Sequence, residues 1–153
     1  MEYRSRLEAL AKQRGRNSRL AMVGAGQMGR GFANQSASMG GIDVAVVADV
    51  DPARIEQAFA DLGLGKPVIS NDVAELNAAI NAGKPAGTTD AFVVAKLDVD
   101  VVVEATGIPE VGARVTSESL KNKKHVAVLN VEMDVTIGPL LTKLAKDNGV
   151  LYS

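Results

Sequence analysis

The sequence predicts an α/β fold with a doubly wound parallel sheet, and three observations support this prediction. First, β-branched apolar segments alternate with amphipathic segments along the chain. Second, residues 44–48 are apolar on both faces, which is typical of a parallel strand covered by helices on both sides. Third, 15 glycines among 153 residues suit a fold with many strand–helix turns. A chain of this length is expected to form one domain.

The composition excludes several classes of function. The chain has no cysteine and one histidine, so it can form neither disulfides, nor thiolate or histidine-cluster metal sites, nor a cysteine nucleophile. A net charge of −1 argues against a nucleic-acid binder, which would normally present a basic face. No apolar run approaches the roughly 18 residues that span a bilayer. We therefore expect no membrane partner and a cytoplasmic location.

Residues 1–17 are predicted to form an N-terminal amphipathic helix that ends at Gly15. Tyr3, Leu7, Leu10 and Ala11 recur at helical spacing. The segment and its flank are also rich in basic residues, namely Arg4, Arg6, Lys12, Arg14, Arg16 and Arg19. Two interpretations remain open: the helix docks on its own domain or on another subunit, or it is simply solvated.

The strongest motif follows the apolar strand predicted at residues 19–23. It is Gly24-Ala25-Gly26-Gln27-Met28-Gly29, which reads G-x-G-x-x-G and opens a helix predicted at 26–39. The first glycine permits a tight turn, the second lets the backbone approach phosphates, and the third lets the helix pack close to the strand. The motif therefore predicts a Rossmann-type NAD(P)-binding domain over residues 18–153, with the pyrophosphate at the helix N-terminus.

The remaining elements are predicted from periodicity, caps and breakers. A strand at 42–48 leads to a helix with Asp51 as N-cap and Pro52 as its first residue. Ser70 or Asn71 is expected to cap a later helix, and Gly138-Pro139 is expected to begin the last one. Further strands are predicted within 67–69, 84–89, 99–105, 125–129 and from 150, with helical segments at 90–97 and from Pro109.

Polar residues at the predicted strand ends complete a cofactor site. Asp49 ends the second strand, about 20 residues past the glycine motif, where a carboxylate accepts hydrogen bonds from the adenosine ribose. It favours NAD, whereas Arg54 in the next helix can reach a 2′-phosphate, so the cofactor is NAD or NADP. Thr106 and Gly107 follow another strand, where the nicotinamide ribose would lie, and Asn130 follows the next.

The sequence does not identify the catalytic acid or base. Glu104, Glu132, Asp134 and Lys96 lie near predicted strand ends, with Glu132 as the weak candidate. Each also has a structural interpretation as a strand-end, turn or helix-start residue. His125 opens a strand and is interpreted as structural, and no nucleophile–base pair is visible.

Four segments carry a family resemblance: VGAGQMGRG at 23–31, ADVDP at 48–52, EATGIPEVG at 104–112 and NVEMDVTIGPLL at 130–141. Together they resemble the homoserine-dehydrogenase-like oxidoreductases that carry a C-terminal SAF domain. That family includes 1-deoxy-D-xylulose 5-phosphate reductoisomerase-like enzymes. The resemblance implies the NAD(P)-binding domain of a longer enzyme, which transfers hydride to a small carbonyl or sugar-phosphate substrate. Reductoisomerase-like members use NADPH, and Val50 stands where relatives commonly have a basic residue.

Three functions are compatible with these observations. The leading hypothesis is that the chain is the cofactor-binding domain of an oxidoreductase. We expect this domain to be inactive alone, because a second domain supplies the substrate wall. The protein can also form a homo-oligomer under this hypothesis. The alternative is a non-catalytic nucleotide-sensing or interaction module that uses the basic N-terminal helix as its contact. A complete small reductase working as a dimer is the third.

Overall fold

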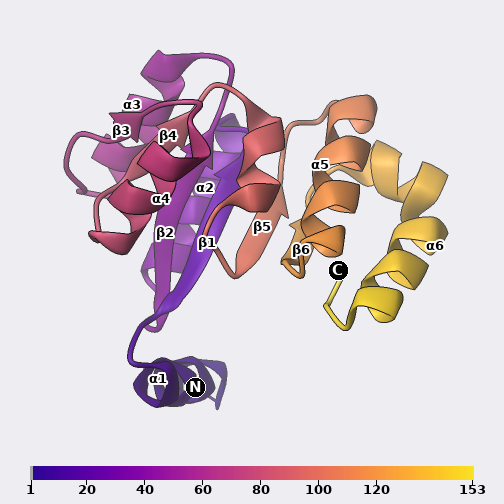
Figure 1. Ribbon diagram of the computed structural model, residues 1–153, viewed down its shortest axis with the longest axis horizontal. Helices are drawn as coiled ribbons and strands as arrows, with labels where there is room; N and C mark the ends of the chain where they lie inside the picture. Colours follow the sequence, from indigo (N-terminus) through magenta and orange to yellow (C-terminus); the bar gives the residue numbers. More distant parts are fainter. Residues whose placement is uncertain (1) are drawn as a thin grey trace.

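The computed structural model describes residues 2–153 and contains a six-stranded sheet in the order β3-β4-β2-β1-β5-β6, with every neighbouring pair parallel (Figure 1). The predicted doubly wound sheet is therefore confirmed. The strands are β1 (Ser18–Val23), β2 (Ile42–Ala48), β3 (Val68–Ile69), β4 (Ala86–Thr88), β5 (Val101–Glu104) and β6 (His125–Val128). Residues 150–152, predicted to start another strand, form a single parallel bridge between Tyr152 and Val126.

Helices lie on both faces of the sheet and account for the strands that are apolar on both sides. These helices are α2 (Gln27–Ala37), α3 (Pro52–Asp61), α4 (Val73–Asn81), the 3₁₀ helix η1 (Ala91–Lys96), α5 (Pro109–Lys121) and α6 (Val131–Asn148), whereas α1 (Glu2–Arg14) lies off both faces (Figure 1). None of the helices in residues 2–153 combines the length and the apolar character that a membrane crossing requires.

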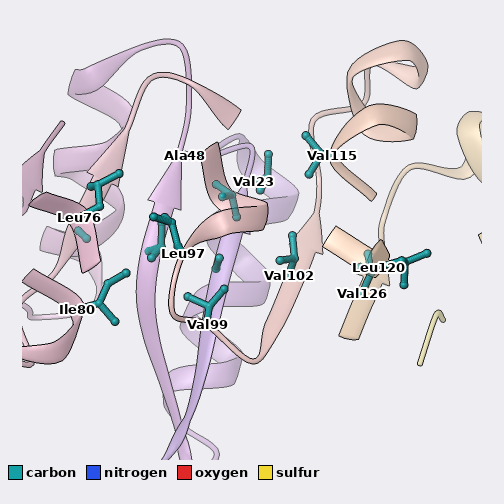
Figure 2. Close-up of a cluster of buried hydrophobic side chains, with 14 of the residues drawn as sticks. Val23, Ala48, Leu76, Ile80, Leu97, Val99, Val102, Val115, Leu120 and Val126 are labelled. Atoms are coloured by element: carbon teal, nitrogen blue, oxygen red, sulfur yellow. The ribbon is translucent and has the colours of Figure 1, made fainter. Parts of the chain in front are cut away.

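Two hydrophobic cores sandwich the sheet, because successive residues of a strand point to opposite faces. On one face, Leu20 and Met22 of β1 pack with Phe59 of α3 and with the small residues of α2. On the other face, Ala21 and Val23 join the larger cluster, which includes side chains from α4 and α5 (Figure 2) and also from α6. That cluster has no aromatic ring fully buried in it and is built mainly from Val, Leu, Ile and Ala, as the composition requires.

Helix α1 lies beside the amino ends of the strands, away from the carboxyl ends (Figure 1). It ends before Gly15, which has a φ of 72°, as the sequence predicts. Leu7 packs on the turn before β2, where a Cβ on Gly41 would come within 2.9 Å of the Leu7 Cβ. Arg16 then binds both oxygens of Asp100, at 2.6 and 3.0 Å, and so fixes the connection to the sheet.

Two predicted helix starts are wrong. The last helix begins at Val131, with the side chain of Asn130 accepting from the N–H of Met133, rather than at Gly138-Pro139. Pro139 therefore lies inside α6 and donates no hydrogen bond to the carbonyl of Val135, four residues earlier. Both residues are exposed, so water can bind this carbonyl instead. Likewise, α4 is capped by Asp72, which accepts from the N–H of Glu75, rather than by Ser70 or Asn71.

Candidate functional site

The carboxyl ends of three strands meet at the centre of the sheet, where the strand order reverses. In the register of the sheet, Val23 of β1 lies between Ala48 of β2 and Glu104 of β5. The chain leaves β1 and β2 toward helices on one face and leaves β5 toward the other face. Such a switch point opens a crevice at the strand ends, which is where open α/β sheets bind ligands.

The glycine loop after β1 fits this crevice because each glycine meets a different constraint. Gly24 has a φ of 97°, and a Cβ there would lie 2.6 Å from the carbonyl oxygen of Ala105. A Cβ on Gly29 would lie 2.0 Å from the carbonyl oxygen of Gly24. Gly26 differs: in the described part of the chain, a Cβ there would meet no non-neighbouring heavy atom within 4 Å. Its face is therefore open to an incoming ligand.

The N-terminus of α2 is arranged to receive an anion. Gly26 is the N-cap, and no side chain within residues 2–153 caps this first turn by a hydrogen bond. Its N–H groups remain available, and the positive end of the helix dipole favours negative charge nearby. A phosphate bound here would accept hydrogen bonds from the backbone at the place where Gly26 leaves space.

Asp49, at the end of β2, orders the same loop. Its Oδ2 accepts from the N–H of Ala25 at 2.8 Å, and its Oδ1 accepts from the N–H of Asp51 at 3.0 Å. Each carboxylate oxygen has a second lone pair, so both can still accept from ribose hydroxyls. Beside it, Val50 is 87% exposed, and the Arg54 Nε lies 3.8 Å from the Asp51 Oδ2. Within residues 2–153, the hydrogen bonds that hold the Asp49 carboxylate in place come from backbone N–H groups.

These elements surround a cavity of about 380 Å³. Of the predicted cofactor residues, Gly24, Gly26, Asp49, Arg54 and Thr106 line it. Several other lining residues carry no cofactor-site motif in the sequence and come from the loop after β4, from η1 and from the start of α5: Thr89, Asp90, Ala91, Phe92, Ile108 and Val111. The signal that identifies the first four is their position directly after a strand.

Phe92 gives this cavity a firm apolar wall. The guanidinium carbon of Arg114, on α5, lies 3.9 Å from the centroid of its ring. Asp90 caps η1 by accepting from the N–H of Phe92 at 2.9 Å, which fixes the start of that helix. An apolar wall facing a few polar groups is typical of a small-molecule site.

The turn after β5 is held by the last residue of that strand. Glu104 is fully buried, and its Oε1 accepts from both the N–H and the hydroxyl of Thr106. The Thr106 Oγ1 in turn accepts from the N–H of Ile108 at 3.2 Å. Gly107 between them has a φ of 67° and is exposed. The glutamate therefore serves as an internal anchor for the turn that lines the cavity.

Other predicted residues lie at its margin or away from it. Gln27 and Met28 are exposed at the start of α2, whereas Ala25 and Gly29 are buried beneath the loop. Asn130 is buried as the cap of α6. None of these five lines the cavity in the described structure.

The remaining catalytic candidates are also outside the cavity lining. Glu132 and Asp134 are exposed in the first turn of α6, and Lys96 is exposed at the end of η1. Asp134 accepts from the hydroxyl of Tyr152 at 2.6 Å. Burial, this hydrogen bond and the charges of Asp134 and Glu104 together raise the pKa of Tyr152 above its ordinary value.

His125 has a structural contact that fits its interpretation from the sequence. It lies at the amino end of β6, whereas the cavity lies at the carboxyl ends of the strands. Its Nδ1 accepts from the N–H of Leu151 at 3.0 Å, which fixes the segment that bridges to β6.

The switch point, the glycine loop and the strand-end carboxylate define a dinucleotide-binding domain. The sequence model for "Homoserine dehydrogenase, NAD binding domain" matches residues 24–152, and the chain belongs to this family. The family match bears out the oxidoreductase-type, NAD-binding character of the fold, and the cofactor is a nicotinamide dinucleotide.

Solved structures share the fold at low sequence identity. A homoserine dehydrogenase from Thiobacillus denitrificans is 20% identical, with a TM-score of 0.64 over 90% of this chain and 29% of its own. A homoserine dehydrogenase from S. aureus is 21% identical, with a TM-score of 0.63 over 90% and 32%. An oxidoreductase from Agrobacterium radiobacter, in complex with NAD+, L-tartaric acid and magnesium, is 12% identical, with a TM-score of 0.67 over 89% and 34%.

The chain thus spans about a third of the length of these structures. No curated protein sequence matches it significantly.

Proposed function

We propose that this chain binds NAD(H) as the cofactor domain of a longer oxidoreductase. The observation that carries the proposal is the convergence of Gly26, Asp49 and Thr106 on one cavity at the switch point of the sheet. Each supports a different part of the cofactor: the open glycine face suits the pyrophosphate, the carboxylate suits the adenosine ribose, and the turn after β5 suits the nicotinamide half.

The residues present fit this cofactor on physical grounds. The uncapped helix N-terminus supplies donors for phosphate oxygens, and the Asp49 carboxylate keeps free lone pairs next to an exposed surface. When bound, the cofactor supplies or accepts a hydride. The chain's own residues bind and orient the cofactor. We assign the proton transfer to none of the residues 2–153.

We further propose that NAD(H) binds more tightly than NADP(H). A 2′-phosphate would sit beside the Asp49 carboxylate, where like charges repel, and Val50 offers no countercharge. Among residues 2–153, Arg54 is the one cation in the cavity lining, and its guanidinium lies beside Asp51. This keeps part of its charge neutralised, which favours the cofactor without the phosphate.

For the whole enzyme, we propose hydride transfer to a small carbonyl or sugar-phosphate substrate. The support is the resemblance of residues 104–112 and 130–141 to homoserine-dehydrogenase-like oxidoreductases with a C-terminal SAF domain, including the reductoisomerase-like enzymes. A second domain would supply the substrate wall and the proton donor. This part is tested by assaying the full-length gene product with homoserine and with sugar phosphates.

The binding proposal is tested by titrating the chain with NADH, NADPH and ADP. We expect NADH and ADP to bind, and NADPH to bind more weakly than NADH. ADP carries the pyrophosphate and the adenosine ribose, so it reports the glycine loop and Asp49 alone. Failure of both NADH and NADPH to bind at millimolar concentration would refute the proposal.

A further inference from the structure

Two buried polar atoms lie close to the same residue, Gly112, behind the turn that lines the cavity. The Glu104 Oε2 and the Asn130 Nδ2 are both buried, and neither has a hydrogen-bond partner in the described part of the chain. They come from the ends of β5 and β6, which are neighbouring strands. Buried polar atoms of this kind are uncommon, and each requires a physical explanation.

Gly112 shows how close the two atoms lie. A Cβ built on this residue of α5 would be 2.8 Å from the Glu104 Oε2 and 2.8 Å from the Asn130 Nδ2. The two atoms therefore cannot be farther apart than twice that distance. They share one small space, which exists because residue 112 has no side chain.

The chemistry of the two atoms is complementary. Asn130 uses its Oδ1 to accept from the N–H of Met133, which leaves its amide nitrogen as the donor that lies beside Gly112. A carboxylate oxygen can only accept, and an amide nitrogen can only donate. The first turn of α5 and the start of α6 also lie here, and helix N-termini favour a negative charge nearby. Thr106 holds one carboxylate oxygen of Glu104, and the other oxygen lies beside the same residue, Gly112, as the Asn130 amide nitrogen.

We propose that Glu104 and Asn130 form a carboxylate–amide pair that positions the Thr106-Gly107 turn for the nicotinamide half of the cofactor. Glu104 is the positioning residue, and it acts through Thr106, which lines the cavity. Asn130 acts through Glu104 while capping α6, so the pair joins the cavity wall to that helix. Gly112 is required because a side chain there would enter the space between the pair. This inference rests on the proposed function.

A reversal of the pair tests the inference. In Glu104→Gln, an amide replaces the carboxylate, so one of its N–H groups must face another donor, either at Thr106 or at Asn130. In Asn130→Asp, two carboxylates face each other, although aspartate remains a good helix cap. The double variant restores one donor and one acceptor with almost unchanged shape. The single variants should therefore be defective, and the double variant should recover.

Binding of NADH and of ADP to the four proteins gives the readout. We expect each single variant to lower the affinity for NADH about tenfold, which corresponds to the loss of roughly one charge-assisted hydrogen bond. The double variant should recover most of this affinity. ADP affinity should stay unchanged throughout, because ADP does not reach the turn after β5. A purely structural role would lower the melting temperature without changing this ratio of affinities.

Several results would overturn the inference. These are an unchanged NADH affinity in both single variants, an equal loss of NADH and ADP, or a double variant no better than the singles. If a single variant does not fold, Thr106→Val removes the hydroxyl donor to Glu104 from the other side and must give the same loss confined to NADH. Wild-type protein that binds neither probe defeats the proposed function and this inference together, whereas unchanged variants of a binding wild type defeat only the inference.

Discussion

Gly26 allows binding and stability to be separated, because the structure places space rather than protein where its Cβ would lie. We expect Gly26→Ala to leave the fold intact and to weaken the dinucleotide. The backbone of Gly26 has a φ of −71° and a ψ of −173°, which alanine adopts without strain. The substitution therefore changes what can approach the loop and not the conformation of the loop itself.

The two effects can be estimated separately. For stability, a compatible Gly→Ala change gains about 0.4–1 kcal/mol from the unfolded state, while alanine at an N-cap loses a similar amount, so the net change is below about 1 kcal/mol. For binding, the methyl group occupies the approach of a phosphate oxygen. Losing one hydrogen bond to a charged group costs about 1.5–3 kcal/mol, which corresponds to about 10- to 100-fold in affinity.

Gly31→Ala is the matched control, since a Cβ at Gly31 also meets no non-neighbouring heavy atom within 4 Å in the described chain. It lies inside α2 and outside the cavity lining, so alanine should stabilise the helix by about 1 kcal/mol and leave binding unchanged. Urea unfolding is best followed by circular dichroism because the chain has no tryptophan, and the fluorescence of NADH itself reports binding. Gly26→Ala with wild-type affinity for both NADH and ADP would refute the assignment of this loop to the pyrophosphate.

Three further changes test other parts of the structure. Gly29→Ala should destabilise the fold by about 1–3 kcal/mol, measured as a lower urea midpoint, because its Cβ would overlap a backbone carbonyl. Burial opposes ionisation of Asp100, but hydrogen bonds from Arg16 and from the backbone lower its pKa overall. Its contribution to the stability of the fold is therefore present above about pH 4 and is lost as the pH falls below that. Asp100→Asn should flatten this acid limb of a profile of melting temperature against pH, and an unchanged limb would contradict the assignment. Asp49→Asn combined with Val50→Arg should raise the ratio of NADPH to NADH affinity in parallel titrations, and a constant ratio would count against the proposed ribose contact.

The parts of the fold that the sequence could predict are those in which local pattern and burial agree. Strand β2 is recognisable because helices cover both faces of most of it, so residues 44–48 are apolar throughout. The start of α3 was recognisable because Asp51 caps it and Pro52 opens it, and both signals act within one turn. Such local signals depend little on distant parts of the chain.

The start of α6 could not be predicted in the same way, because two local signals conflicted. Gly138-Pro139 has the sequence of a helix start, yet the helix already runs through it from the Asn130 cap. What decides is tertiary packing: Met133 and Leu141, on either side of the proline, are both buried in the core. Asn130, which the sequence places among the cofactor residues, is itself buried as the cap of this helix.

In the candidate site, too, the local sequence is not sufficient, because the glycine motif does not by itself specify the shape of the loop after β1. Gly24 has a positive φ and also no room for a Cβ, because the turn after β5 passes within contact distance, and Gly29 has no room for one because the carbonyl of Gly24 lies against the helix. The carboxylate of Asp49 then holds the N–H of Ala25. Three strand ends therefore build one loop, and of its three glycines Gly26 is the one at which a Cβ would meet open space in the described chain. A G-x-G-x-x-G pattern is informative to the extent that its surroundings account for the first and third glycines, because the second is then the one that the proposed cofactor would explain.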